Sequence, residues 1–247
     1  MSIAIISDVH IKPNRNNEQE ILLKFLSNEK VVNASKIVLL GDIFDFFCGP
    51  HKQFINIYPA IFKRIQFLLE NGSVIYYFEG NHDVHIESFF RKYFSKFYQE
   101  KKLIIEQYSL DFNINGKKYY FSHGDELEPN SEAYQKYKAF ILSKPIKILA
   151  EKIMPYFILS KLAQKASDAS RNRGRLVFNE AKVRDSYRQG AEVKLKQGYD
   201  VVVSGHCHVK DFYESDFGVY VNNGYAPEEN TFIYISESNT ITFEKLD

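Results

Sequence analysis

Five short clusters of aspartate, asparagine and histidine are spread along the chain, and each begins where a hydrophobic run ends. They are Asp8-Val9-His10, Gly41-Asp42-Ile43-Phe44-Asp45, Gly80-Asn81-His82-Asp83, Ser122-His123-Gly124-Asp125 and Gly205-His206-Cys207-His208. A hydrophobic run that stops at polar residues is typical of a buried strand, and neighbouring strand ends bring such side chains to one edge of a sheet. Carboxylate, amide and imidazole groups are ligands for divalent metals. The pattern therefore predicts a metal site and favours a hydrolase.

Length and charge limit the other classes of protein. The chain has 247 residues, enough for one large core with an insertion, and a formal net charge of +1, so no overall field points to nucleic acid as a partner. The two cysteines, Cys48 and Cys207, lack the spacing of a disulfide framework, and the first residues do not resemble a signal peptide. No apolar stretch is long enough to span a bilayer. We expect a cytoplasmic protein.

Strand and helix patterns alternate in the first third of the chain. We predict strands at residues 3–7, 36–40 and 74–79, with helices at 17–26 and 55–70 between them. A helix at 89–97 precedes strands at 103–108, 110–114 and 118–122, the last two joined by the hairpin turn Asn115-Gly116. Further strands are expected at 201–204, 219–221, 231–235 and 240–243. The fold class is therefore α/β.

A helical insertion interrupts this pattern. Helices are predicted at 131–142, 145–155, 157–169 and 176–197, divided in part by Pro145 and Pro155. Between residues 136 and 196 the chain carries 15 lysines and arginines against five acids, an excess of ten positive charges. We therefore predict two units: residues 1–127 with 198–247 form the core, and residues 128–197 form a helical cap.

The chemistry of two adjacent metals explains the mixture of residue types. A carboxylate can bridge two cations through its two oxygens, and Asp42 is the candidate bridge. Such cations activate water at neutral pH and offset the negative charge of a phosphate, while imidazole and amide ligands keep the site receptive to anions. Simpler interpretations exist for single residues. Asp45 can cap a following helix, and Cys207 suits packing better than metal binding.

The five clusters, in this order, resemble the pattern of calcineurin-like metallophosphoesterases. The resemblance covers the chain outside the insertion and implies a two-layered β-sandwich flanked by helices, with two divalent metal ions. Mn²⁺ is favoured by the family, and Fe²⁺ or Zn²⁺ also suits these ligands. The resemblance further implies that one metal is held by Asp8, His10, Asp42 and His208, and the other by Asp42, Asn81, His123 and His206. His82 would contact the phosphate or protonate the leaving group, oriented by Asp45 or another nearby carboxylate, and Asn81 would also contact the phosphate.

The insertion resembles a narrower family, the UDP-2,3-diacylglucosamine pyrophosphatases of lipid A biosynthesis. The stretches that carry this likeness are Gly124-Asp125-Glu126-Leu127, Ala133-Tyr134-Gln135, Met154-Pro155-Tyr156-Phe157 and Arg171-Asn172-Arg173. The implied substrate is a UDP-linked lipid, cleaved to UMP and a diacylated glucosamine phosphate. Tyr134 and Ser167 would contact its head group. Lys161, Lys165 and Arg171 would bind its diphosphate or anionic lipids, which places the protein peripherally at the inner membrane face.

One residue departs from the narrower family and keeps other functions open. His82 stands where many of those pyrophosphatases have arginine, and a histidine can transfer a proton whereas an arginine only binds charge. One alternative is a metallophosphoesterase that acts on another nucleotide, on a phosphodiester such as nucleic acid, or on a phosphoprotein. The other is a non-catalytic member of the family that binds a partner. No protein partner is evident from the sequence, and it does not determine the oligomeric state.

Overall fold

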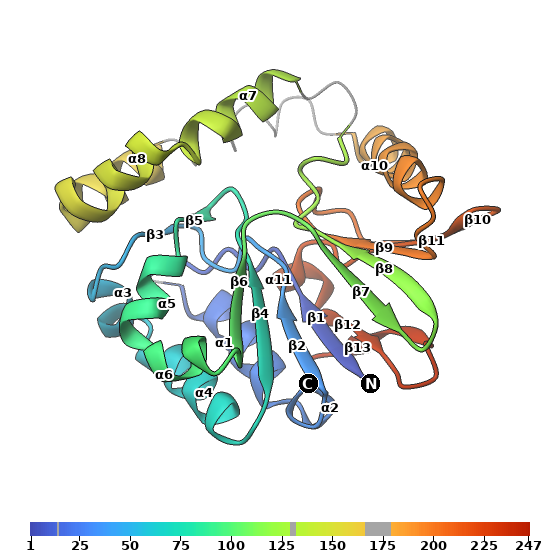
Figure 1. Ribbon diagram of the computed structural model, residues 1–247, viewed down its shortest axis with the longest axis horizontal. Coiled ribbons are helices and arrows are strands. Elements are labelled where there is room, and N and C mark those ends of the chain that lie inside the picture. The colour runs from blue at the N-terminus through green and yellow to red at the C-terminus, as the bar shows by residue number, and fades with distance from the viewer. Residues whose placement is uncertain (14, 129–131, 166–178) are drawn as a thin grey trace.

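Two β-sheets lie face to face in the computed structural model, which describes residues 1–13, 15–128, 132–165 and 179–247 (Figure 1). The first sheet has the strand order β13-β12-β1-β2-β4-β6. Its strands are β1 (Ile3–Ile6), β2 (Lys36–Leu39), β4 (Val74–Phe78), β6 (Leu103–Glu106), β12 (Thr231–Ile235) and β13 (Ile241–Lys245). β1, β2, β4 and β6 are parallel, so their carboxyl ends share one edge.

The second sheet has the order β10-β11-β9-β8-β7. Its strands are β7 (Leu110–Ile114), β8 (Lys117–Phe121), β9 (Val201–Ser204), β10 (Asp211–Ser215) and β11 (Gly218–Asn222). β7 and β8 form the hairpin expected from Asn115-Gly116, and β8, β9 and β11 are parallel to one another. This sheet therefore also presents three carboxyl strand ends at one edge.

The alternation of side chains along each strand divides the core. Ile3 and Ile5 of β1 point into the layer between the sheets, where they join Phe121 and Val203 of the second sheet. Ala4 and other residues of the opposite face pack against α1 (Asn16–Ser27), α4 (Pro59–Glu70) and α5 (Glu87–Tyr93). The predicted two-layered sandwich flanked by helices is confirmed.

Two of the predicted helices are wrong in extent. The expected helix at 55–70 is divided into α3 (Gln53–Ile57) and α4, because Pro59 has no N–H and takes the first position of a new helix. The expected helix at 89–97 is divided at Phe94 into α5 and α6 (Ser95–Gln99). There the backbone leaves the helical conformation, and the ring packs against Phe90 at 5.6 Å. Packing decides that break, which a periodic pattern does not reveal.

Several short elements escaped the sequence analysis. They are α2 (Glu29–Val32), α11 (Ala226–Glu229), β10 and a small parallel sheet made of β3 (Phe47–Cys48) and β5 (Asp83–Val84). β3 and β5 each have two residues, too few for an alternation of apolar and polar residues to be recognised.

The helical insertion has two locations in the fold. α7 (Glu132–Ile141), α8 (Lys144–Ile148) and the π-helical turn η1 (Leu149–Ile153) lie beyond the carboxyl ends of the strands, at the top of Figure 1, and residues 156–165 continue as helix. α10 (Glu180–Leu195) instead packs on the outer face of the second sheet, where Tyr187 and Ala191 join the cluster of Val202 and Tyr220. The division into core and cap stays a prediction. Ser167 and Arg171 lie outside the described residues.

Candidate metal centre

The five polar clusters meet at the carboxyl edges of the two sheets. Asp8, Asp42 and Asn81 follow β1, β2 and β4 of the first sheet, while His123 and His206 follow β8 and β9 of the second. Because the edges face each other across the sandwich, residues almost 200 positions apart become neighbours. The structure thus brings together the seven side chains predicted as metal ligands: Asp8, His10, Asp42, Asn81, His123, His206 and His208.

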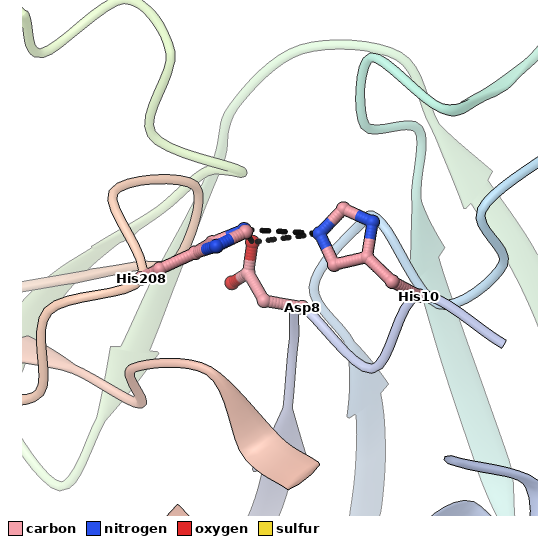
Figure 2. Close-up of side chains that lie close together, drawn as sticks. All are labelled: Asp8, His10 and His208. Atoms are coloured by element: carbon pink, nitrogen blue, oxygen red, sulfur yellow. Dashed lines mark hydrogen bonds and ion pairs between the residues drawn. The ribbon is translucent and has the colours of Figure 1, made fainter. Parts of the chain in front are cut away.

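One group of possible ligands consists of Asp8, His10 and His208 (Figure 2). The Nε2 atoms of His10 and His208 lie 2.9 Å apart, and His208 Nε2 lies 3.4 Å from Asp8 Oδ1. Figure 2 shows both rings directed toward each other beside the Asp8 carboxylate. Two imidazole nitrogens so close need a proton or a cation between them, so this arrangement fits a metal ion.

A second group consists of Asp42, His123 and His206. His123 Nε2 lies 3.1 Å from His206 Nδ1, 3.4 Å from Asp42 Oδ2 and 3.3 Å from Asn81 Oδ1. Asp42 Oδ2 also lies 3.6 Å from His10 Nε2 in the first group. Asp42 Oδ2 therefore lies between the two groups, while Oδ1 accepts the His82 N–H at 2.9 Å, and the bridging role of Asp42 stays a prediction.

Backbone contacts orient both His123 and Asp8. His123 Nδ1 lies 3.0 Å from the Leu40 carbonyl oxygen, which only accepts, so Nδ1 carries a proton and Nε2 is the nitrogen that can bind a metal. The Asp8 carboxylate accepts the backbone N–H of His206 at 3.0 Å. This hydrogen bond ties the first sheet to the second at the site itself.

The loops that carry the clusters have an unusual backbone. Asp8, His10, Asp42, His206 and His208 all have positive φ angles, between 52° and 68°. Side chains other than glycine seldom adopt this region, and such conformations concentrate at functional sites. Neighbouring glycines leave the space these loops need: a Cβ on Gly80 would lie 2.2 Å from Asp42 Oδ1, and one on Gly205 2.3 Å from Asp8 Oδ2.

Asp83 is a positioning residue that the sequence analysis did not identify. Its buried carboxylate accepts the backbone N–H groups of Asp42, Ile43 and Gly80 and the hydroxyl of Tyr77, at 2.7–3.0 Å. Burial, followed by the charge of Asp42, raises the pKa of Asp83 to about 7 in the metal-free protein. Asp83 thereby joins the loops after β2 and β4. Asn222 does the same in the second sheet, where its amide donates to the Gly205 carbonyl at 2.7 Å.

His82 lies beside the first ligand group, and its ring is 4.8 Å from that of His10. The backbone carbonyl of Asp45 accepts from His82 Nδ1 at 3.0 Å, whereas the nearer Asp45 carboxylate oxygen is 4.0 Å away. Asp45 therefore contacts His82 mainly through its backbone. Its carboxylate also lies 3.9 Å from His10 Nδ1, and Asp45, His10 and His82 form a third close group.

The pKa values of the metal-free site follow from burial and close charges. Burial lowers the pKa of His10 to about 3 and, together with His123, that of His206 to about 4, so both offer neutral imidazoles at pH 7. Burial also opposes charge on His123, but the Asp42 carboxylate outweighs it and raises that pKa to about 10. A cation at this site would replace the His123 proton.

The predicted substrate-binding residues have different environments. Tyr134 of α7 lies over the second ligand group, with its ring 5.7 Å from that of His206, and its buried hydroxyl has no hydrogen-bond partner among the described residues. Lys161 and Lys165 are exposed on the helix of residues 156–165. Their roles remain predictions. Among the described residues, no helix combines the length and the apolar composition required to cross a bilayer.

An ion pair not foreseen from the sequence attaches α7 to the site. Lys138 Nζ lies 2.7 Å from both oxygens of the Asp125 carboxylate, which is buried two residues beyond His123. Gln135 donates to the Asp125 backbone carbonyl at 2.9 Å. Both partners on α7 are polar residues in an amphipathic pattern, so only the fold reveals that they point inward.

Comparison with known proteins agrees with this geometry. The model of the calcineurin-like phosphoesterase family matches residues 1–210. A protein of Psychromonas ingrahamii named UDP-2,3-diacylglucosamine hydrolase is 25% identical over 210 residues, covering 84% of this chain and 81% of its own. A protein of Histophilus somni (strain 129Pt) with the same name is 25% identical over 211 residues, covering 85% of each chain.

A solved structure has a similar fold. The crystal structure of TT1561 from Thermus thermophilus superposes with a TM-score of 0.50 and 13% sequence identity, covering 100% of this chain and 99% of the other. This likeness concerns the fold alone.

Proposed function

This chain belongs to the calcineurin-like phosphoesterase family, and from that premise we propose that it hydrolyses the diphosphate of UDP-2,3-diacylglucosamine to UMP and 2,3-diacylglucosamine 1-phosphate. The family and the relatives indicate a metal-dependent hydrolase. The observation that carries the substrate is the extent of the likeness to the named hydrolases. The 210 matched residues exceed the predicted core of 1–127 and 198–247, so the likeness includes part of the helical insertion.

Divalent metals fit the clusters at the strand ends. Asp8, His10 and His208 would hold one ion, His123, His206 and Asn81 the other, and Asp42 would bind both. Two carboxylates against two divalent ions leave the centre positively charged, which suits a diphosphate. When bound, the metals supply an activated water at neutral pH and offset charge on the phosphate oxygens. The mixed oxygen and nitrogen ligands favour Mn²⁺, with Fe²⁺ or Zn²⁺ as alternatives.

The protein's own groups position the substrate and move the proton. His82 Nδ1 donates to the Asp45 carbonyl, so Nε2 is the atom left to face the substrate, and with both ring nitrogens protonated it donates to a phosphate oxygen or to the departing oxygen. Asn81 directs its amide oxygen toward His123, and its amide nitrogen can donate to the same phosphate. Tyr134 brings a buried hydroxyl, which has no partner in the part of the chain that the structure describes, to the second ligand group, where a polar head group would satisfy it.

The described helices of the cap suit a lipid-bearing substrate. Ile153, Phe157 and Leu162 are between 50% and 65% exposed although they are large and apolar. Lys161 and Lys165 are exposed on the same segment, so an acyl chain or an anionic membrane surface would find both apolar and positive groups there. We place the protein in the cytoplasm, in peripheral contact with the inner face of the membrane.

The direct test is UMP release from UDP-2,3-diacylglucosamine after Mn²⁺ is added to chelated protein, run beside a bis-aryl phosphodiester. Rapid release that requires metal would support the proposal. Turnover of the generic diester without UMP release would support metal-dependent hydrolysis and reject UDP-2,3-diacylglucosamine as the substrate.

The second candidate is a metallophosphoesterase that acts on another nucleotide, a phosphodiester or a phosphoprotein. His82 favours it, because a proton donor at this position helps a poorer leaving group than UMP. His82→Arg distinguishes the two. For the lipid pyrophosphatase the variant should retain most UMP release, whereas an enzyme that needs the proton should lose activity.

A further inference from the structure

A cavity of about 250 Å³ opens beside the metal centre. It lies between the connection from β6 to β7 and helix α7, which passes above that connection in Figure 1. Gln107, Tyr108 and Ser109 come from the connection, Gln135 and Ala139 from α7, and the predicted metal ligand His123 forms part of the wall. A group that enters this cavity is therefore next to the second ligand group. Of the predicted substrate-binding residues that the structure describes, Tyr134, Lys161 and Lys165, none lines it.

The charges of the wall do not suit a phosphate. Lys138 lines the cavity, but the Asp125 carboxylate holds its ammonium group at 2.7 Å. Glu79 and Glu126 add two carboxyl groups. Glu79 is buried and accepts from the Ile86 N–H and the Gln107 amide, and Glu126 accepts from the Tyr120 hydroxyl. The cavity thus offers acceptors and neutral amide groups, which bind uncharged donors such as sugar hydroxyls and ring N–H groups.

We propose that this cavity is a nucleoside subsite, which receives the base and ribose while the attached phosphates lie at the metal centre. The proposal rests on the hydrolysis of a UDP-linked substrate proposed above. A side-chain amide has a donor and an acceptor side by side, as does the edge of uracil, so Gln107 can pair with the base. Tyr108 is 66% exposed and offers an aromatic face on which a base can stack.

This subsite would divide recognition of the substrate between two elements. The nucleoside would lie under α7 beside the second sheet, and the lipid part would lie along α8 and the helix of residues 156–165. The metal centre would then hold the diphosphate between this polar cavity and the exposed apolar side chains of the cap.

Calorimetric titration of the Mn²⁺-loaded protein with UMP and with ribose 5-phosphate tests the subsite. The two ligands share the phosphate and the sugar and differ in the base. UMP should bind roughly tenfold more tightly, as expected for stacking and one or two added hydrogen bonds. Gln107→Leu, which removes the amide, and Ala139→Leu, which fills the cavity from α7, should each reduce the advantage of UMP by roughly three- to tenfold.

The matched control is Gln66→Leu, the same substitution at an exposed position of α4. It should leave both affinities unchanged. Equal binding of the two ligands, or an advantage of UMP that survives both cavity variants, would overturn the subsite. The measurement does not depend on turnover. Lipid hydrolysis without a base-dependent affinity would reject the cavity alone, and base-dependent binding without lipid hydrolysis would reject the proposed substrate.

Discussion

The metal centre and the helices above it are built in different ways. At the metal centre, buried hydrogen bonds from Asp83 and Asn222 fix the loops, and five side chains are held in a left-handed backbone. α7, α8 and the π-helical turn make polar contacts with the core from single residues, and Tyr156, just beyond the turn, packs on Phe46 and Phe54. His85 and His51 reach the backbone carbonyls of Ile141 and Ala150, and Lys138 pairs with Asp125.

This difference separates the chemistry from its substrate. A buried network with every loop cross-linked keeps ligand atoms in place, as metal catalysis requires. Helices attached by a few single contacts open at a lower free energy and can admit a large amphipathic molecule. Changes in the network should therefore abolish the reaction, whereas changes in the attachments should alter mainly substrate binding.

Removal of the bridging carboxylate should have the largest effect. Asp42→Ala deletes the oxygen that lies between the two ligand groups. The charge stabilisation from a metal is several kcal/mol, and each ~1.4 kcal/mol changes the rate tenfold, so kcat should fall by about three orders of magnitude. Steady-state hydrolysis of a bis-aryl phosphodiester in Mn²⁺ buffer measures it.

Asp216→Ala is the matched control, because Asp216 is exposed in the turn between β10 and β11. It should retain the wild-type rate. Near-normal turnover by folded Asp42→Ala protein would mean that the clusters at the strand ends are not the catalytic centre.

The next largest effect should come from Asp83, which positions the loops that carry the predicted ligands. Asp83→Ala leaves the Asp42, Ile43 and Gly80 N–H groups buried without an acceptor. Loss of such a supporting residue should weaken metal binding by roughly 10- to 100-fold and lower the free energy of unfolding by about 3 kcal/mol. Metal titration and urea unfolding measure the two quantities.

Tyr77→Phe provides a graded comparison, since it removes only the hydroxyl that donates to Asp83. Its cost should be about 1 kcal/mol, with metal affinity nearly unchanged. If both variants bind metal as the wild type does, Asp83 supports the fold without positioning the ligands.

The fold class and the clustered residues could be predicted from the sequence because both depend on local patterns. Apolar runs that stop shortly before Asp8, Asp42 and His123 show where strands end. Parallel strands then bring these carboxyl ends together at one edge of the sheet. The roles of Asp83 and Lys138 depend on partners 40 and 13 positions away and are invisible to periodicity. We expected Asp45 to orient His82, and its closer contact with His82 comes from the backbone carbonyl rather than from the carboxylate. Because every residue has a backbone carbonyl, the sequence gives no sign of this contact.

Loosening α7 should affect substrate binding more than the reaction. Lys138→Met leaves the buried Asp125 carboxylate without its cation, which costs about 3 kcal/mol locally. We expect amide exchange in α7 to become at least about tenfold faster and KM for the lipid substrate to rise by a similar factor. Lys136→Met, an exposed neighbour on the same helix, should change neither. Equal exchange in both variants would show that the ion pair does not hold α7.

A smaller effect is expected at the apolar surface of the cap. Phe157→Ser removes a ring that is 60% exposed, so binding to vesicles with anionic lipids should weaken by about fivefold, as partial burial of a phenylalanine predicts. Phe67→Ser, at a 46% exposed ring of α4 in the core, is the control. Equal losses in the two variants in a sedimentation assay would remove the cap as the membrane-facing surface.

The smallest effect should come from a histidine that joins the cap to the core. His85 is buried, and its Nε2 donates to the Ile141 carbonyl at 2.9 Å, while its Nδ1 has no partner within residues 1–13, 15–128, 132–165 and 179–247. Burial lowers the pKa of His85 below the ordinary 6.5, with Lys147 acting in the same direction and Glu151 against it. The unfolded chain therefore binds this proton more readily. Stability from the neutral ring is present above pH 6.5 and is lost as the pH falls below it.

The variant His85→Asn should not show this loss, and asparagine tolerates the positive φ of 55° at this position. Between pH 7.5 and 5.5, roughly one pH unit on either side of the ordinary pKa, Tm of the wild type should drop on the order of 2 °C more than Tm of the variant. Metal-free protein suits the measurement, because the histidines of the metal centre titrate equally in both proteins and cancel in the difference. Parallel pH profiles would show that protonation of His85 is not linked to folding, and the hydrogen bond from Nε2 to Ile141 would then hold α7 equally well in both protonation states.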